Sequence, residues 1–149
     1  MVHIQPALAS LPVPSELIER AAGATLAHEN VQADLTVVLT DDTQLQQMNR
    51  EYLGVDSPTD VLAFPASDTD PDSGALYLGD VLISIPQARA HAQVAGHPLA
   101  SEVQLLIVHG VLHLLGYDHG QPAAKIRMWA AQAEVLQDLG LAKIHISES

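Results

Sequence analysis

Three histidines toward the C-terminal end of the chain have the spacing of metal ligands. His109 and His113 are four residues apart, so on a helix both imidazoles point to the same face, one turn apart. Gly116 then lets the chain turn back without a Cβ clash, and His119 follows three residues later. Three neutral imidazoles with an open fourth position are typical of a catalytic zinc site. The pattern therefore predicts one zinc ion per chain, bound by His109, His113 and His119.

The residue after the first histidine distinguishes this site from zinc proteases with the same ligand spacing. Metzincin proteases also follow the pattern H-x-x-x-H-x-x-G-x-x-H, and they place a glutamate, the general base, directly after the first histidine. Here that position is Gly110. A positioned proton acceptor contributes about 10²–10⁴-fold to a rate, and peptide hydrolysis also needs a proton donor for the leaving amine. The missing glutamate therefore disfavours a protease, and we expect the space beside Gly110 to accept a substrate phosphate.

Several neighbouring residues have an ordinary structural interpretation. Asp118 either accepts a hydrogen bond from a ligand imidazole or is a solvated turn residue. Tyr117 is expected to pack, and Lys125 and Arg127 are expected to lie on a solvated helix face. The remaining histidines lack ligand spacing and are expected to be surface residues: His3, His28, His91, His97 and His145.

The composition indicates one folded domain, residues 1–149. The chain is 48% hydrophobic and 16% charged, as in globular proteins. No apolar run approaches the roughly 20 residues that span a bilayer, and the N-terminus has no signal-peptide pattern. The absence of cysteine leaves histidine and carboxylate as metal ligands and is compatible with a reducing cytoplasm. The net charge of -12 disfavours broad electrostatic binding to nucleic acid.

The elements that must position the histidines follow from apolar periodicity and turn residues. Expected strands cover residues 2–5, 35–39, 60–64 (ended by Pro65) and 78–85, and residues 66–74 read as a loop. Expected helices cover residues 14–28, 41–52, 87–95, 98–115 and 122–138. This order predicts an α+β domain with a small, mixed, mostly parallel sheet covered by helices. The metal-binding helix and loop lie near its C-terminal third.

Three segments of the chain resemble the YbeY family of bacterial endoribonucleases and ribosomal-RNA maturation factors. They are HGVLHLLGYDH (residues 109–119), MNREYLGVDSPTDVLAFP (residues 48–65) and LGDVLIS (residues 78–84). The resemblance implies zinc on the three histidines and cleavage of single-stranded RNA. It further implies a role in maturation of the 3′ end of 16S ribosomal RNA, ribosome quality control and contact with the small ribosomal subunit.

The second segment departs from the family pattern at positions that bear on RNA binding. The family usually has an arginine after the tyrosine of this segment, and here the position is Leu53. Lysines that typically surround the aspartate are replaced by Val55 and Ser57. We therefore take Arg50, about one helical turn earlier, as the candidate catalytic arginine. Asp60, which matches the family motif, either holds the loop near the metal or is a turn residue before a strand.

Three functions are compatible with these observations. The first is a zinc-dependent endoribonuclease acting on ribosomal RNA. The second is a ribosome-assembly factor with a structural metal and little hydrolytic activity, which the lost basic residues favour. The third is a metal-dependent peptidase, which Gly110 disfavours.

Overall fold

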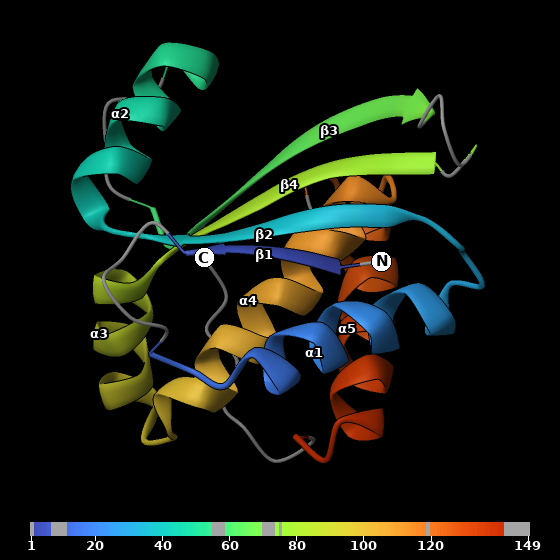
Figure 1. The fold of residues 1–149 in the computed structure, drawn as a ribbon. Helices are drawn as coiled ribbons and strands as arrows, with labels where there is room; N and C mark the ends of the chain where they lie inside the picture. Colours follow the sequence, from blue (N-terminus) through green and yellow to red (C-terminus); the bar gives the residue numbers. More distant parts are fainter. Residues whose placement is uncertain are drawn as a thin grey trace.

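The computed structural model describes residues 2–6, 12–54, 59–69, 74, 76–118 and 120–141. The strands are β1 (Val2–Pro6), β2 (Asp34–Thr40), β3 (Val61–Thr69) and β4 (Leu76–Ser84). The helices are α1 (Ser15–His28), α2 (Asp42–Leu53), α3 (Ile85–Ala95), α4 (Leu99–Leu114) and α5 (Pro122–Asp138). Figure 1 shows these elements arranged around a single sheet.

The sheet has the strand order β1-β2-β4-β3. β1 pairs with β2 and β2 with β4 in parallel, whereas β3 runs antiparallel to β4 at one edge. The parallel neighbours β1 and β2 are joined through α1, as expected for a strand-helix-strand unit. The mixed, mostly parallel sheet predicted from the sequence is confirmed.

The two faces of the sheet are covered by different helices (Figure 1). Alternation along β4 sends Val81 and Ile83 into the main core, which includes α1, α4 and α5. Leu82 points the other way and packs with Leu45 of α2 and Leu62 of β3 in a small second core. α2 therefore lies on the opposite face of the sheet from α4.

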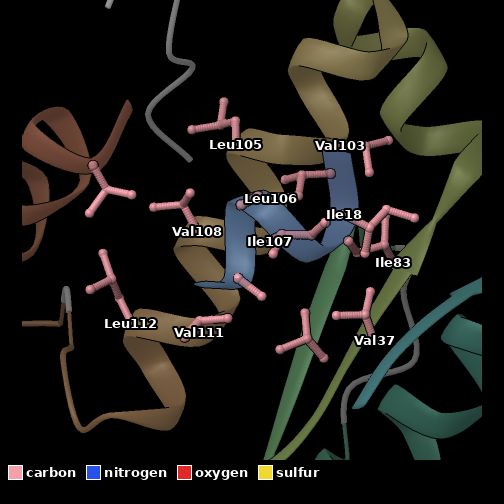
Figure 2. Close-up of a cluster of buried hydrophobic side chains, with 14 of the residues drawn as sticks. Ile18, Val37, Ile83, Val103, Leu105, Leu106, Ile107, Val108, Val111 and Leu112 are labelled. Carbon is pink, nitrogen blue, oxygen red and sulfur yellow. The ribbon is translucent and has the colours of Figure 1, made fainter. Parts of the chain in front are cut away.

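Helix α4 lies at the centre of the main core, and this burial singles out its histidines. Figure 2 shows side chains of α4 in one buried cluster with Ile18 of α1, Val37 of β2 and Ile83 of β4. Between residues 102 and 114, every residue is buried except His109 and His113. A helix that is apolar on nearly all sides is a core element. These two histidines therefore mark the place where α4 reaches the surface.

Side-chain caps set the start of α2 and of α3, and the sequence predicted the first of these caps. The Asp41 side chain accepts a hydrogen bond from the Gln44 backbone N–H at 2.9 Å and so caps α2. Ser84 caps α3 in the same way, by accepting from the Gln87 N–H at 3.3 Å. This cap starts α3 at Ile85, a residue predicted to belong to the preceding strand.

Strand β3 continues past Pro65, contrary to the expected end at that residue. The strand is an edge strand, where proline is tolerated. After a register irregularity the pairing resumes and reaches Thr69, opposite Leu76. Part of the predicted loop at residues 66–74 is therefore strand. Opposite Pro65, a Cβ on Gly79 would lie 2.1 Å from the Phe64 carbonyl oxygen, so the close approach of the two strands needs glycine there.

Candidate metal centre

His109 and His113 face one pocket between α4 and the edge strand β3. Their ring centroids are 4.8 Å apart with an interplanar angle of 73°. The pocket has a volume of about 390 Å³. Residues 59–63 and Pro65 line one side, and His109, Gly110 and His113 line the other. The one-turn spacing predicted for the two imidazoles is therefore present, and it opens onto a space that can hold a small ligand.

The orientation of His109 is fixed by a buried glutamine of α5. The Nδ1 atom of His109 lies 3.0 Å from Oε1 of Gln132, whose exposed fraction is 1%. An amide oxygen only accepts hydrogen bonds, so Nδ1 of His109 donates. In the neutral imidazole this leaves the lone pair on Nε2. Metal-binding histidines typically have such a partner on the second ring nitrogen, so the donor chemistry of His109 fits a metal ligand.

An aromatic residue of α5 lies beside the same histidine, and a basic residue lies over the aromatic ring. The Trp129 ring packs edge-to-face against His109, with centroids 5.7 Å apart. The Lys125 ammonium lies 5.9 Å from the centre of the Trp129 ring. A flat ring beside a cation can stack a nucleobase and attract a phosphate. Lys125, expected on a solvated face, thus lies over the ring that packs against His109.

The end of α4 turns as the glycine predicts. Gly116 has φ +101°. Its N–H donates to the His113 carbonyl at 3.0 Å, and the Tyr117 N–H donates to the Leu112 carbonyl at 3.0 Å. This pair of bonds is a Schellman motif, which usually has glycine at the residue with positive φ. The predicted third ligand, His119, lies outside the described residues.

The space expected beside Gly110 is filled by the sheet. A Cβ at this position would lie 2.6 Å from Cγ1 of Val81 and 3.4 Å from Cγ2 of Val61. Val81 is fully buried, and its branched side chain is stiff. Gly110 therefore lets α4 pack against β4. The missing side chain therefore leaves no vacant space toward the sheet, although Gly110 still lines the pocket beside the histidines. That this pocket accepts a substrate phosphate stays a prediction.

Arg50 and Asp118 lie apart from the lining of the pocket. Arg50 is exposed near the C-terminal end of α2, and the residues that line the pocket do not include it. Asp118 is exposed, and its Oδ1 accepts a hydrogen bond from the Gly120 N–H at 3.2 Å. This bond is the turn role considered for Asp118. The catalytic role of Arg50 stays a prediction.

Tyr117 packs at the end of α4, as expected. Its side chain is partly buried against the main core. A hydrogen bond with Glu29 raises the pKa of Tyr117 above its usual 10.0, and burial raises it further. Tyr117 is therefore a protonated packing residue at neutral pH.

A second cluster of ionisable residues escaped the sequence analysis. Nδ1 of His91 lies 3.2 Å from Oδ2 of Asp60. Nε2 of His97 lies 2.7 Å from Oε1 of Glu102, and both side chains are more than nine-tenths buried. The expectation that His97 is a surface residue was wrong, because the carboxylate of Glu102 gives it a buried partner. His97 and Glu102 are five positions apart, whereas Asp60 is distant in the sequence and joins the cluster only through tertiary packing.

Comparison with known proteins identifies the family. The sequence model described as Endoribonuclease YbeY matches residues 11–140. The chain belongs to the YbeY family. The YbeY relative from Roseiflexus sp. (strain RS-1), named Endoribonuclease YbeY, is 44% identical over 88% of this chain and 87% of its own length. The relative of the same name from Chloroflexus aurantiacus (strain ATCC 29366 / DSM 635 / J-10-fl) is 46% identical over 85% of this chain and 88% of its own length.

A solved structure with low sequence identity to this chain has a similar fold. The solution structure of a Thermotoga maritima protein matches with a TM-score of 0.58 at 22% identity. The match covers 94% of this chain and 92% of that one. At this identity the likeness concerns the fold alone. Among the helices of the described residues, none has the length and apolarity needed to span a membrane.

Proposed function

We propose that this chain is a zinc-dependent endoribonuclease that cleaves single-stranded RNA during maturation of the 3′ end of 16S ribosomal RNA. In this role it contacts the small ribosomal subunit in the cytoplasm and contributes to ribosome quality control. The observation that carries the proposal is the exposure of His109 and His113 from an otherwise buried stretch of α4 into one pocket. The names of the relatives that share most of the chain's length support an RNA substrate.

The two described histidines would hold the metal, with His119 as third ligand on the strength of the sequence pattern. The bond to Gln132 holds the His109 ring with its Nε2 available. When bound, zinc would supply Lewis acidity for the attack of water on a phosphodiester. The Schellman turn at Gly116 sets the direction in which the chain leaves α4 toward residue 119.

Substrate binding would use the surface next to the histidines. Trp129 provides a ring on which an unpaired base can stack, and Lys125 provides a positive charge for the backbone. Stacking of this kind needs a base that is free of a duplex, so the arrangement favours single-stranded RNA. The lining of the pocket itself includes the carboxylate of Asp60 and no lysine or arginine among the described residues. Phosphate would therefore be attracted from the α5 side and by the ion.

RNA cleavage tests the proposal directly. A single-stranded RNA and its duplex are incubated with zinc-loaded wild type, His113→Ala and His3→Ala, with zinc content measured on each. His3 is an exposed histidine of β1 and serves as the matched control. We expect wild type and His3→Ala to cut the single strand in preference to the duplex, and His113→Ala to lose both zinc and cleavage. Wild type that retains zinc without cutting RNA would instead indicate an assembly factor with a structural metal.

A further inference from the structure

We propose that Asp60, His91 and Glu102 form a second divalent-cation site, separate from the histidine pair. Each residue offers one ligand atom, and these atoms all lie within 4.8 Å of one another. Nδ1 of His91 and Oδ2 of Asp60 are 3.2 Å apart. Ligands about 2.1 Å from one ion at adjacent coordination positions are separated by about this distance. The three atoms are thus arranged to share an ion.

Three elements hold the ligands in place. The Asp60 carbonyl oxygen accepts a hydrogen bond from the Ser84 N–H at 2.9 Å, which ties the start of β3 to the end of β4. His91 lies on α3, which Ser84 caps. Glu102 lies in the first turn of α4. Because His91 and Glu102 lie on helices and Asp60 is held at its backbone directly before β3, the ligands need little reorganisation to bind an ion.

The burial of Glu102 is the strongest sign of a ligand. Its exposed fraction is 5%, and a buried carboxylate is costly unless it is paired. His97 satisfies Oε1 at 2.7 Å. Within the described part of the chain, Nδ1 of His97 is buried without a hydrogen-bond partner. That fits the tautomer protonated on Nε2, which donates to Glu102. Carboxylates that bind metals are typically held by such a hydrogen bond.

The donor set indicates which ions the site accepts. Two carboxylates and one imidazole combine hard oxygen donors with a nitrogen donor. Magnesium and calcium prefer oxygen ligands alone, whereas manganese and zinc accept both kinds. With a net charge of -12, the chain also gains from a bound cation electrostatically. We therefore assign the site to a first-row divalent cation such as Mn²⁺ or Zn²⁺.

Glu102 of this site and the histidine pair lie on separate turns of α4. Glu102 and His109 are seven residues apart on α4, which is about 10 Å along the axis at a rise of 1.5 Å per residue. Ions that share one phosphate in two-metal centres are about 3.5–4 Å apart. Asp60 nevertheless lines the pocket that holds His109 and His113. A cation at this site would neutralise the carboxylate of Asp60 in the pocket. Its effect on RNA binding rests on the proposed function.

Manganese binding tests the site without reference to RNA cleavage. Protein pre-loaded with one equivalent of Zn²⁺ is titrated with Mn²⁺, and free Mn²⁺ is followed by electron paramagnetic resonance. We expect one Mn²⁺ per chain in wild type, and at least tenfold weaker binding in His91→Ala. The His91 side chain is 43% exposed on a helix, so alanine preserves the fold there. His3→Ala is the matched control and should bind Mn²⁺ as wild type does.

Two further variants decide where the ion lies. Glu102→Gln should also weaken Mn²⁺ binding, and His113→Ala should leave it unchanged. Absence of Mn²⁺ binding in wild type, or binding unaffected by His91→Ala, would overturn the proposal. So would binding lost in His113→Ala, because the ion would then lie at the histidine pair. A protein that cleaves no RNA but binds Mn²⁺ through His91 would contradict the proposed function and leave this site standing.

Discussion

Nδ1 of His109 and Oε1 of Gln132 lie 3.0 Å apart and join α4 to α5 beside the pocket. Gln132 is an almost completely buried polar residue on an otherwise apolar helix face, at 1% exposure. Buried amides are kept where they make a specific hydrogen bond. The bond therefore explains both the position of the glutamine and the orientation of the imidazole.

Replacing this glutamine should weaken metal binding more than it weakens the fold. Loss of a hydrogen-bond partner behind a metal ligand typically costs 10–100-fold in affinity. We expect Gln132→Leu to lower zinc affinity by about that factor, as measured by competition with a chelator. Gln137→Leu, at an exposed position of the same helix, is the control. Equal affinities of both variants and wild type would mean that His109 does not bind the ion.

The turn at the end of α4 should depend on glycine. Gly116 has φ +101°, a region that β-branched residues avoid. We expect Gly116→Val to lower the free energy of unfolding by about 1–3 kcal/mol and to weaken zinc binding, because the ligand loop starts here. Denaturant unfolding and zinc titration measure the two effects. Gly23→Ala in α1, where a Cβ meets no atom within 4 Å, should instead be neutral or stabilising. Wild-type zinc affinity in Gly116→Val would contradict this account.

The contact between Gly110 and Val81 predicts that the effect of Gly110→Ala on stability changes sign when Val81 is replaced by a smaller residue. Alanine favours a helix over glycine by about 1 kcal/mol, but overpacking a core costs about 1–3 kcal/mol. With Cγ1 of Val81 only 2.6 Å from the added Cβ, we expect Gly110→Ala to destabilise the wild-type protein. In a Val81→Ala background the same change should be neutral or stabilising. A double-mutant cycle of unfolding free energies measures the coupling, and additive effects would show that the two residues do not compete for space.

His28 should stabilise the protein most at mildly acidic pH. Its hydrogen bond with Glu134, at 2.6 Å, is the largest cause that raises its pKa above the usual 6.5, and Glu29 at 2.7 Å adds to it. A raised pKa in the folded state gives stability that is complete below pH 6.5 and fades as the pH rises through the folded value. The difference in unfolding free energy between wild type and His28→Ala should therefore be larger at about pH 6 than at about pH 9. Tyr117, which also contacts Glu29, stays protonated across this range because its pKa is raised. A difference that is constant or grows with pH would contradict the assignment.

Local sequence signals were sufficient for the helices and for the histidine pair. Pro122 and Gly140 bracket α5, and Asp41 caps α2, because each of these residues acts within one turn of its own position. Likewise, the four-residue spacing of His109 and His113 fixes their relation on a helix before any tertiary contact forms.

Signals that depend on distant neighbours were missed or misread. The sequence predicted that β3 ends at Pro65. The strand continues past this residue because an edge strand tolerates proline. The space at Gly110 could not be judged without knowing that Val81 packs opposite it. Asp60 and Glu102 are 42 positions apart in the chain and share a cluster only because β3, α3 and α4 meet.

The packing of Gly110 against Val81 also restricts how this chain could evolve toward proteolysis. Acquiring the metzincin glutamate at position 110 would first require a smaller residue at position 81, since the larger side chain cannot enter the existing contact. That first step would open a cavity in the main core and lower stability before any catalytic benefit appeared. The two substitutions are thus epistatic, and a selection experiment starting from this sequence should find peptidase variants only through a destabilised intermediate.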